Sequence, residues 1–469
     1  MPQRRNFLKM TGLLGAGLLS DFTNPAWASP EAPEGHTSDR PGTDGFNMSG
    51  FAAPKLDTVR IGIVGLGNRG PAAIERLALI EGVEIKALCD IRPEKANAVK
   101  TKLAGSVHQP KLYTENGESW KKMCEQPDLD LIYITTPWAL HTPIATYAMK
   151  QGKHVCVEVP AAKTIDECWQ LVETSESTRK HCMMLENCCY DFFELLTLNM
   201  VRQGILGEIV HGEGAYLHYL LDQNFSKDYY YDFWRLKENL RNGNLYPTHG
   251  LGPVAQVMNI NRGDRMEILT SRQSQDFSMH AKALSLASTD SFYNAYTNKS
   301  FRGNMNTTSI LTSKGKTIML QHDVSSPNIY SRIFKIQGTK GSVLKYPQPG
   351  KVAIGHEDWL KPEEYDKMEK TWSPPIIKKM GEMAKQVGGH GGMDFLMDWR
   401  MIDCLRNGLP LDMDVYDAAA WSSVAPLSEW SVANNSKPIA IPDFTRGHWK
   451  TNTPVDITLE KGGTTGIRK

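Results

Sequence analysis

Short apolar runs alternate with amphipathic stretches along the first part of the chain. The strand-like runs, rich in β-branched side chains, are residues 59–64, 83–89, 131–137, 154–158 and 183–185. The helix-like stretches between them include residues 71–80, 145–151 and 164–178. Strands that alternate with helices in this way predict an α/β domain with a doubly wound parallel sheet of the Rossmann type, over residues 58–187.

The alternation ends after Asn187, and the remaining chain is richer in strand-like runs that carry aromatic clusters. These runs include residues 216–219, 229–235 and 316–323. The pattern predicts a second, α+β domain over residues 188–469, built on a large and mostly antiparallel sheet that binds the substrate.

The N-terminus has the layout of an export signal. Arg4-Arg5 precede an apolar stretch at residues 10–20, and Ala26-Trp27-Ala28 follow it. This layout predicts a twin-arginine signal over residues 1–28, cleaved after Ala28, and a periplasmic or secreted protein; the alternative is a merely basic N-terminus. The apolar stretch is about 11 residues, too short to cross a bilayer core of about 30 Å, so no membrane span is expected. Residues 29–57 are rich in Pro, Gly and Ser and predict a linker or mobile tail.

Charge and cysteine content narrow the function. The 469 residues carry 53 Lys and Arg against 52 Asp and Glu, so nothing in the charge balance indicates a nucleic-acid partner. The eight cysteines include no C-x-x-C pair, which argues against a zinc site, and no metal is expected. A twin-arginine substrate folds in the reducing cytoplasm, so mostly free and buried thiols are expected.

A dinucleotide-binding fingerprint follows the first strand. Gly65, Gly67 and Gly70 form a G-x-G-x-x-G pattern that opens a predicted helix, and the next strand ends at Asp90. The glycines permit a tight turn, close approach of the backbone to a pyrophosphate and close helix packing. A carboxylate at Asp90 would accept from the ribose 2′-hydroxyl and repel a 2′-phosphate, which favours NAD over NADP. The alternative is a structural glycine turn.

Loops after later strands are expected at the nicotinamide end of the site, because ligands of such sheets bind beyond the carboxyl ends of the strands. With the turn itself, the predicted cofactor-binding set is Gly65, Gly67, Asn68, Arg69, Gly70, Asp90, Trp138, His141, Glu158, Val159 and Asn187.

Several motifs resemble known families. The glycine turn, the Thr-Thr-Pro-x-x-x-His loop ending at His141 and the Glu-x-Pro at Glu158 resemble the glucose–fructose oxidoreductase and inositol dehydrogenase superfamily. Three later segments look more specifically like glycoside hydrolase family 109, the NAD-dependent α-N-acetylgalactosaminidases. They are residues 246–250, 389–395 and 414–419.

The resemblance implies an activity. The enzyme would oxidise C3 of a terminal α-linked N-acetylgalactosamine with NAD, remove the C2 proton, eliminate the aglycone, add water and reduce C3 again, with no net redox change. It implies His249 and Tyr246 as the catalytic pair, in roles that are interchangeable at this stage. It also implies substrate contacts from Tyr216, Arg235, Tyr246, Pro247, Thr248, His249 and Tyr330. A homodimer is among the assemblies it allows.

The residues leave two alternative functions open. An exported NAD(P)-dependent sugar oxidoreductase would share the signal and the fingerprint, but such relatives commonly have a lysine where this chain has Val159, and an Asp where it has Leu245. A non-catalytic NAD- and sugar-binding protein is the other alternative. His390, flanked by glycines on both sides, lies either in a loop that closes over a ligand or in a simple turn.

Overall fold

The computed structural model describes residue 40 and residues 46–468. The predicted export signal, residues 1–28, lies outside the described residues. Over the part of the chain that is described, no helix is both long and apolar enough to cross a bilayer.

The first domain is built on a parallel sheet, as predicted, and has six strands, one more than the sequence runs indicated. Its strands are β1 (Val59–Val64), β2 (Val83–Cys89), β3 (Lys111–Tyr113), β4 (Leu131–Ile134), β5 (His154–Val157) and β6 (Cys182–Met184). They lie in the order β3-β2-β1-β4-β5-β6. From β1 the next strands are added toward one edge of the sheet, and from β4 they are added toward the other edge. Ligands of doubly wound sheets bind at the switch point between these two strands.

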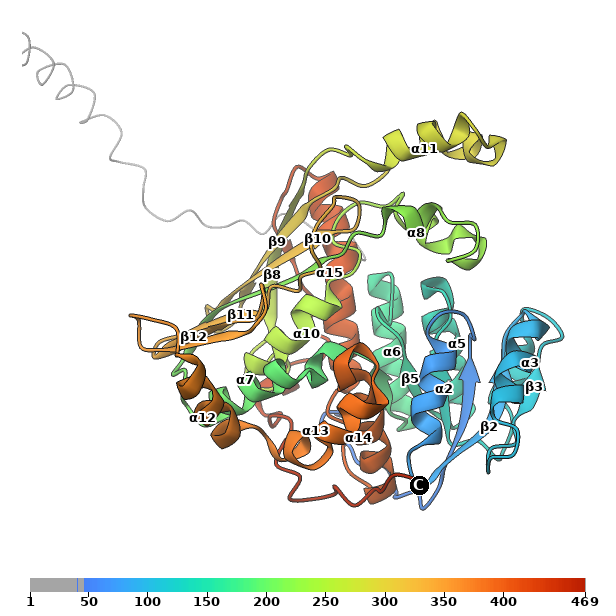
Figure 1. Ribbon diagram of the computed structural model, residues 1–469, viewed down its shortest axis with the longest axis horizontal. Coiled ribbons are helices and arrows are strands. Elements are labelled where there is room, and N and C mark those ends of the chain that lie inside the picture. Colours follow the sequence, from blue (N-terminus) through green and yellow to red (C-terminus); the bar gives the residue numbers. More distant parts are fainter. Residues whose placement is uncertain (1–39, 41–45, 469) are drawn as a thin grey trace, which may run out of the picture.

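Helices cover both faces of this sheet (Figure 1). They are α2 (Gly70–Ala78), α3 (Pro93–Lys102), α4 (Ser119–Cys124), α5 (His141–Lys150) and α6 (Ile165–Thr178). Sequence patterns did not predict α3, because this helix buries only Ala96 and Val99 and so carries little apolar periodicity.

The second domain is built on an eight-stranded sheet with the order β13-β12-β11-β7-β10-β9-β8-β14. Its strands are β7 (Ile209–Leu217), β8 (Met266–Gln273), β9 (Asn306–Thr312), β10 (Thr317–Asp323), β11 (Lys335–Gly338), β12 (Gly341–Leu344), β13 (Lys351–Ile354) and β14 (Ile439–Ala440). β7 and β10 pair in parallel and the other pairs are antiparallel, which confirms the predicted mostly antiparallel sheet.

One predicted run was wrong. Residues 229–235 form no strand; they lead through a 3-10 turn at Tyr231–Phe233 into the helix α9 (Trp234–Glu238). Asp232 and Phe233 have φ values of 52° and 51°, left-handed angles that a strand cannot contain. Tyr230 and Trp234 of this run pack against each other at the cleft described below, and Phe233 packs against Phe292.

Two long helices near the C-terminus join the domains. α15 (Val415–Ala433) packs against both β8 and α6, and α14 (Met393–Asn407) packs against α2 (Figure 1). The remaining helices lie around the second sheet. They are α7 (Phe192–Arg202), α8 (Leu221–Phe225), α10 (Thr248–Val257), α11 (Met279–Ala287), α12 (Pro362–Trp372) and α13 (Pro375–Val387).

The described part of the predicted linker, Arg40 and residues 46–57, lies on the folded body. Met48 is buried, its N–H lies 3.1 Å from the Tyr416 hydroxyl, and the Leu56 N–H donates to the Leu405 carbonyl. An extended segment held by such contacts shows no apolar periodicity in its sequence. The prediction of a linker therefore rested only on the Pro, Gly and Ser content of the segment. All eight cysteines are free and buried, as expected.

Candidate active site

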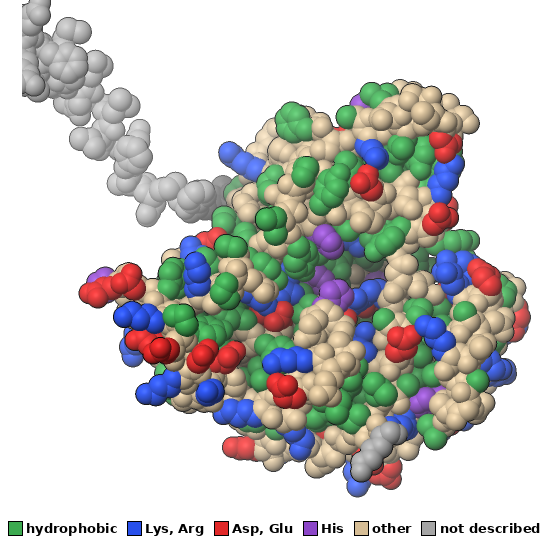
Figure 2. Space-filling view, viewed as in Figure 1, with side chains coloured by type: hydrophobic (Ala, Val, Ile, Leu, Met, Phe, Trp, Pro, Cys, Tyr) green, Lys and Arg blue, Asp and Glu red, His purple; other side chains and the backbone are tan. Residues whose placement is uncertain are grey.

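A cleft of about 650 Å³ lies between the two domains. Figure 2 shows a hollow near the centre of the view, with histidine side chains in it. The cleft is lined by these predicted site residues: Gly65, Gly67, Asn68, Arg69, Asp90, Trp138, His141, Glu158, Val159, Tyr216, Arg235, Tyr246, His249 and also His390. The other predicted site residues do not line it: Gly70, Asn187, Pro247, Thr248 and Tyr330.

The glycine turn after β1 is shaped by close backbone approach. Gly65 has φ +92°, and a Cβ there would lie 2.7 Å from the Thr135 carbonyl oxygen. A Cβ at Gly70, the first residue of α2, would lie 2.2 Å from the Gly65 carbonyl oxygen. At Gly67, by contrast, a Cβ would meet only the Arg92 guanidinium, at 3.6 Å. Two glycines therefore close the turn, and the third leaves its cleft side open to a ligand.

Asp90 holds the nucleotide end of the cleft together. Its carboxylate accepts from the Leu66 N–H at 2.7 Å and from the Arg92 N–H at 2.9 Å, and it pairs with the Arg92 guanidinium at 3.1 Å. A segment of the second domain crosses here, because Asn68 donates to the Tyr229 carbonyl at 2.8 Å and Arg92 lies 4.8 Å from the Tyr231 ring centroid. We call residues 228–232 the strap.

His141, which was predicted to contact the cofactor, joins two loops of the cleft wall. Its Nδ1 lies 2.7 Å from the Pro160 carbonyl and its Nε2 lies 2.8 Å from the Thr136 carbonyl. Burial lowers the pKa of His141, although both carbonyls oppose this effect. The side chain therefore fixes the loops after β4 and β5 and contributes little to the cleft surface itself, since it is 1% exposed.

The donors and shapes around the turn fit a dinucleotide. The N-terminus of α2 opens into the turn, where unpaired N–H groups favour phosphate. The Thr136 hydroxyl, at the carboxyl end of β4, is buried without a hydrogen-bond partner, although Thr136 lines the cleft. An orphaned polar group of this kind is costly unless a ligand satisfies it. The turn, the helix N-terminus and Thr136 together suit a bound nicotinamide dinucleotide.

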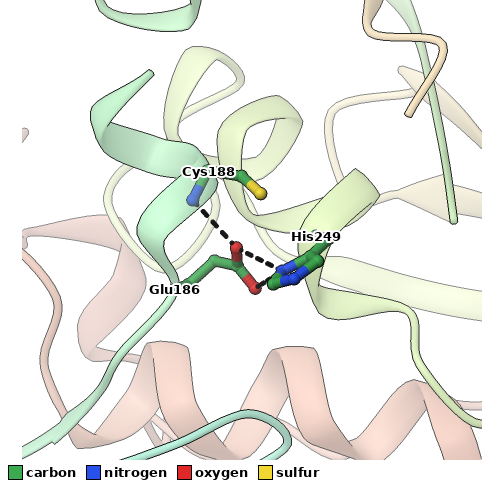
Figure 3. Close-up of side chains that lie close together, drawn as sticks. All are labelled: Glu186, Cys188 and His249. Carbon is green, nitrogen blue, oxygen red and sulfur yellow. Dashed lines mark hydrogen bonds and ion pairs between the residues drawn. The ribbon is translucent and has the colours of Figure 1, made fainter. Parts of the chain in front are cut away.

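At the other end of the cleft, a fully buried carboxylate holds His249 (Figure 3). The Nδ1–H of His249 donates to Glu186, at 2.8 Å from Oε1 and 3.0 Å from Oε2. Burial by itself would raise the pKa of Glu186, but the charge and hydrogen bond of His249 and the Cys188 N–H hold it below the ordinary value. Glu186 therefore fixes the Nδ1–H tautomer and leaves Nε2 of His249 free to exchange protons.

Glycines bring this histidine into place. A Cβ at Gly214 would lie 2.3 Å from the Gly250 carbonyl oxygen, so these two glycines let β7 and the first turn of α10 touch. A Cβ at Gly252 would lie 2.7 Å from Cγ of Glu186, so this position leaves room for the carboxylate. The close approach puts the ring of Tyr216, on β7, at 5.5 Å from that of His249.

An aromatic cluster surrounds the free nitrogen of His249. The Tyr246 hydroxyl lies 3.4 Å from Nε2, and the Tyr246 ring stacks on Trp138 at 5.7 Å and lies 4.6 Å from Tyr216. Burial raises the pKa of Tyr246 well above its usual value, and that of Tyr216 to about 12. Both phenols therefore enter the cleft protonated. Tyr330 lies behind this cluster, with its ring 6.3 Å from that of Tyr216.

Glu186, Cys188 and His249 also place three potential metal-ligand atoms within 4.8 Å of one another (Figure 3). The surroundings do not suit a cation. The Arg332 guanidinium lies 3.0 Å from the Cys188 sulfur, and Nδ1 of His249 is hydrogen-bonded to the carboxylate. We therefore interpret the group as a hydrogen-bonded pair beside a thiol that faces a positive charge.

A second histidine enters the cleft from α14's side. His390 lies in a turn in which residues 388–392 all have φ values between 47° and 108°. Its Nδ1 lies 2.9 Å from Oδ2 of Asp394, which leaves Nε2 available on a side chain that is 54% exposed and lines the cleft. Asp394 also pairs with Arg69 and accepts from Asn187, so Asn187 supports the site from behind.

Sequence reasoning assigned no role to three residues that shape the site: Glu186, His218 and Asp394. Nδ1 of His218 lies 2.9 Å from the Tyr216 hydroxyl, within hydrogen-bonding distance. Burial and the charge of Arg235 lower the pKa of His218 to about 4. Glu186 stands next to Asn187 at the end of β6, so the rule that ligands lie beyond strand ends pointed to its neighbourhood. Asp394 lies in the family-like segment at residues 389–395, but nothing in that segment indicates which residue its carboxylate contacts.

Comparison with known families assigns both halves of the chain. Residues 190–451 match the family model described as glycosyl hydrolase 109, C-terminal domain. Residues 59–186 match the model described as oxidoreductase family, NAD-binding Rossmann fold.

Individual relatives agree over most of their length. The chain is 49% identical to glycosyl hydrolase family 109 protein 2 of Phocaeicola vulgatus, over 86% of this chain and 98% of that protein. It is 45% identical to a glycosyl hydrolase family 109 protein of Shewanella sp. strain W3-18-1, over 97% and 98%. Among solved structures, levoglucosan dehydrogenase in complex with NADH and levoglucosan has the same fold, with a TM-score of 0.61 at 17% identity over 82% of this chain and all of that one.

Proposed function

The chain belongs to glycoside hydrolase family 109 and carries an NAD-binding Rossmann-type domain, and on this basis we propose that it hydrolyses terminal α-linked N-acetylgalactosamine from glycans with the help of tightly bound NAD. The observation that carries the proposal is the Glu186–His249–Tyr246 hydrogen-bonded chain. It opens into the same cleft as the dinucleotide turn. Proton-transfer groups thus lie beside a redox cofactor's site.

The chain supplies the groups for the proton steps of this route. NAD, when bound, provides reversible oxidation at C3 of the sugar, which acidifies the hydrogen on C2. His249, with Nε2 free, accepts a proton at the C3 hydroxyl and Glu186 stabilises the resulting imidazolium. Tyr246 lies within reach of the neighbouring C2 region, since its hydroxyl is 3.4 Å from the same nitrogen. His390, on the opposite side with Nε2 free, is placed to protonate the leaving oxygen on C1.

Two buried side chains disfavour the alternative of a sugar oxidoreductase. Val159 and Leu245 are each 3% exposed and carry no titratable group, although dehydrogenase relatives commonly place Lys and Asp at these positions. The structural likeness to levoglucosan dehydrogenase shows the fold and does not restore those groups.

NAD is favoured over NADP by Asp90. Its carboxylate lies at the end of β2, where the adenosine ribose binds in such folds, and it would repel a 2′-phosphate. Arg92 beside it works in the opposite direction, but its guanidinium is paired with Asp90 and stacked on Tyr231.

Export and assembly complete the proposal. The twin-arginine signal favours loading of the cofactor in the cytoplasm before transport to the periplasm or outside. The second sheet leaves apolar side chains exposed, each by more than a third: Val210, Ile268, Leu311 and Ile354. A homodimer through this sheet would cover them, and light scattering of the purified protein tests it.

The proposed function is tested with p-nitrophenyl α-N-acetylgalactosaminide and no added cofactor. We expect release of nitrophenol by the purified protein, and its loss in His249→Ala protein whose NAD content is unchanged. Absence of release, together with reduction of added NAD by a free sugar, would instead establish the oxidoreductase.

A further inference from the structure

Arg235 is a cation without a counter-ion inside the sugar end of the cleft. Among the described residues, no carboxylate lies within 4 Å of its guanidinium, whereas the cleft's Arg69 and Arg92 pair with Glu158 and Asp90. A charge in a partly buried site is expensive unless something compensates it.

Aromatic rings hold this cation in place without neutralising it. The guanidinium carbon lies 4.9 Å from the ring centroid of Tyr246, 5.3 Å from Trp138, 5.6 Å from Tyr230 and 5.9 Å from Trp234. Burial opposes the charge, but the neighbouring tyrosine hydroxyls outweigh it and raise the pKa of Arg235, so the side chain stays positive. Rings attract a cation through their faces, and a guanidinium carries five N–H donors, so Arg235 keeps donors for a ligand in the cleft that it lines.

The position of Arg235 matches a charge that the proposed reaction creates. Tyr246, the last member of the proton-transfer chain, contacts Arg235 through its ring, so the cation lies directly beside that chain. Once His249 has released the C3 hydroxyl proton to solvent, Tyr246 accepts the C2 proton and passes its own hydroxyl proton to Nε2 of His249. The electron pair left at C2 is delocalised onto the C3 oxygen as an enolate. The glycosidic oxygen then departs from C1 with its bonding electrons as the C1–C2 double bond forms and the C3 ketone is restored.

We propose that Arg235 is a catalytic residue that stabilises the enolate oxygen formed at C3 when the C2 proton is removed. The inference rests on the proposed function and extends it to the intermediate of the elimination. A fixed positive group aimed at developing negative charge in a site that excludes water is an effective catalyst, because it needs no reorganisation when the charge appears. It also supplies the charge that a metal ion would otherwise provide at this oxygen.

Arg235→Gln removes the charge and Arg235→Lys retains it. With p-nitrophenyl α-N-acetylgalactosaminide we expect kcat to fall by about 10²–10³-fold in Arg235→Gln, as for loss of one oxyanion-stabilising donor, and by less in Arg235→Lys. With substrate deuterated at C2, the isotope effect on kcat should grow in Arg235→Gln, because proton removal becomes the slowest step. Cofactor content and melting temperature should stay near those of the unmodified protein.

Arg241→Gln is the matched control, since this arginine pairs with Glu429 at 2.8 Å and does not line the cleft. An unchanged isotope effect in Arg235→Gln, or equal losses in the Gln and Lys variants, would overturn the role of Arg235 alone. If the unmodified protein released sugar that kept all its C2 deuterium, the elimination route itself would fail, and the enolate proposal with it.

Discussion

Replacement of Glu186 by Gln isolates the charge behind His249. Gln keeps the size of the side chain and an oxygen that can accept from Nδ1–H, so the histidine tautomer is retained. The two short contacts, 2.8 and 3.0 Å, involve an ionised carboxylate, and a hydrogen bond to a charged group contributes about 1.5–3 kcal/mol against about 1 kcal/mol for a neutral one. The difference of about 1–2 kcal/mol in stabilising the imidazolium predicts a fall in kcat of roughly 5–30-fold.

Glu186→Ala removes the acceptor as well and frees the ring to rotate, so its loss of kcat should exceed that of Glu186→Gln by about tenfold or more. Both variants are assayed for nitrophenol release at saturating substrate, with bound NAD measured in each preparation. Glu213→Gln serves as the control, because Glu213 pairs with Lys335 at 2.7 Å and does not line the cleft. Full activity in Glu186→Gln, or equal rates in the Gln and Ala variants, would show that the charge of Glu186 does not stabilise the His249 imidazolium.

Three further outcomes are expected. Tyr231→Ala loses a ring–cation contact with Arg92 that is worth about 0.5–1 kcal/mol. The dissociation rate of NAD, measured after dilution, should therefore rise about 2–5-fold. An unchanged dissociation rate would show that the strap does not help to retain the cofactor. Asp90→Ala should weaken NAD binding and narrow its preference over NADP, measured by calorimetry on cofactor-free protein; a preserved preference would contradict the role of the carboxylate. Burial lowers the pKa of His181 to about 3 and of His154 to about 4, so the stability that their neutral forms provide is complete above about pH 6.5 and is lost as the pH falls toward 4. Between pH 6.5 and pH 5, denaturant titration should show that the free energy of unfolding falls by about 2 kcal/mol less in the His181→Phe variant than in the unmodified protein. The same pH dependence of this free energy in both proteins would contradict the role of His181.

The fold of the first domain was predictable because its strands are buried on both faces. The runs Leu131–Ile134 and His154–Val157 are buried at every position and mostly apolar, and the glycine turn between strand and helix gives the order of the elements. Prediction failed where that signal is absent, as in α3, or where it misleads, as at residues 229–235. There the aromatic side chains have high strand propensity, but tertiary packing dictates a kinked helical segment.

The site was predictable only where a motif spans it. Gly65, Asp90, Tyr246 and His249 belong to local patterns, and the structure brings all four to one cleft. Glu186 lies 63 residues from the histidine that it holds, so their contact is a property of the tertiary fold and of the glycines that let α10 approach.

We propose that the protein cleaves glycosides by a transient oxidation with no net redox change, and hydrolysis in heavy water tests this step directly. The substrate is p-nitrophenyl α-N-acetylgalactosaminide, no cofactor is added, and the released sugar is analysed by proton NMR. We expect deuterium at C2 of the sugar and no net change in the redox state of the bound NAD. Released N-acetylgalactosamine with its C2 proton fully retained would contradict it.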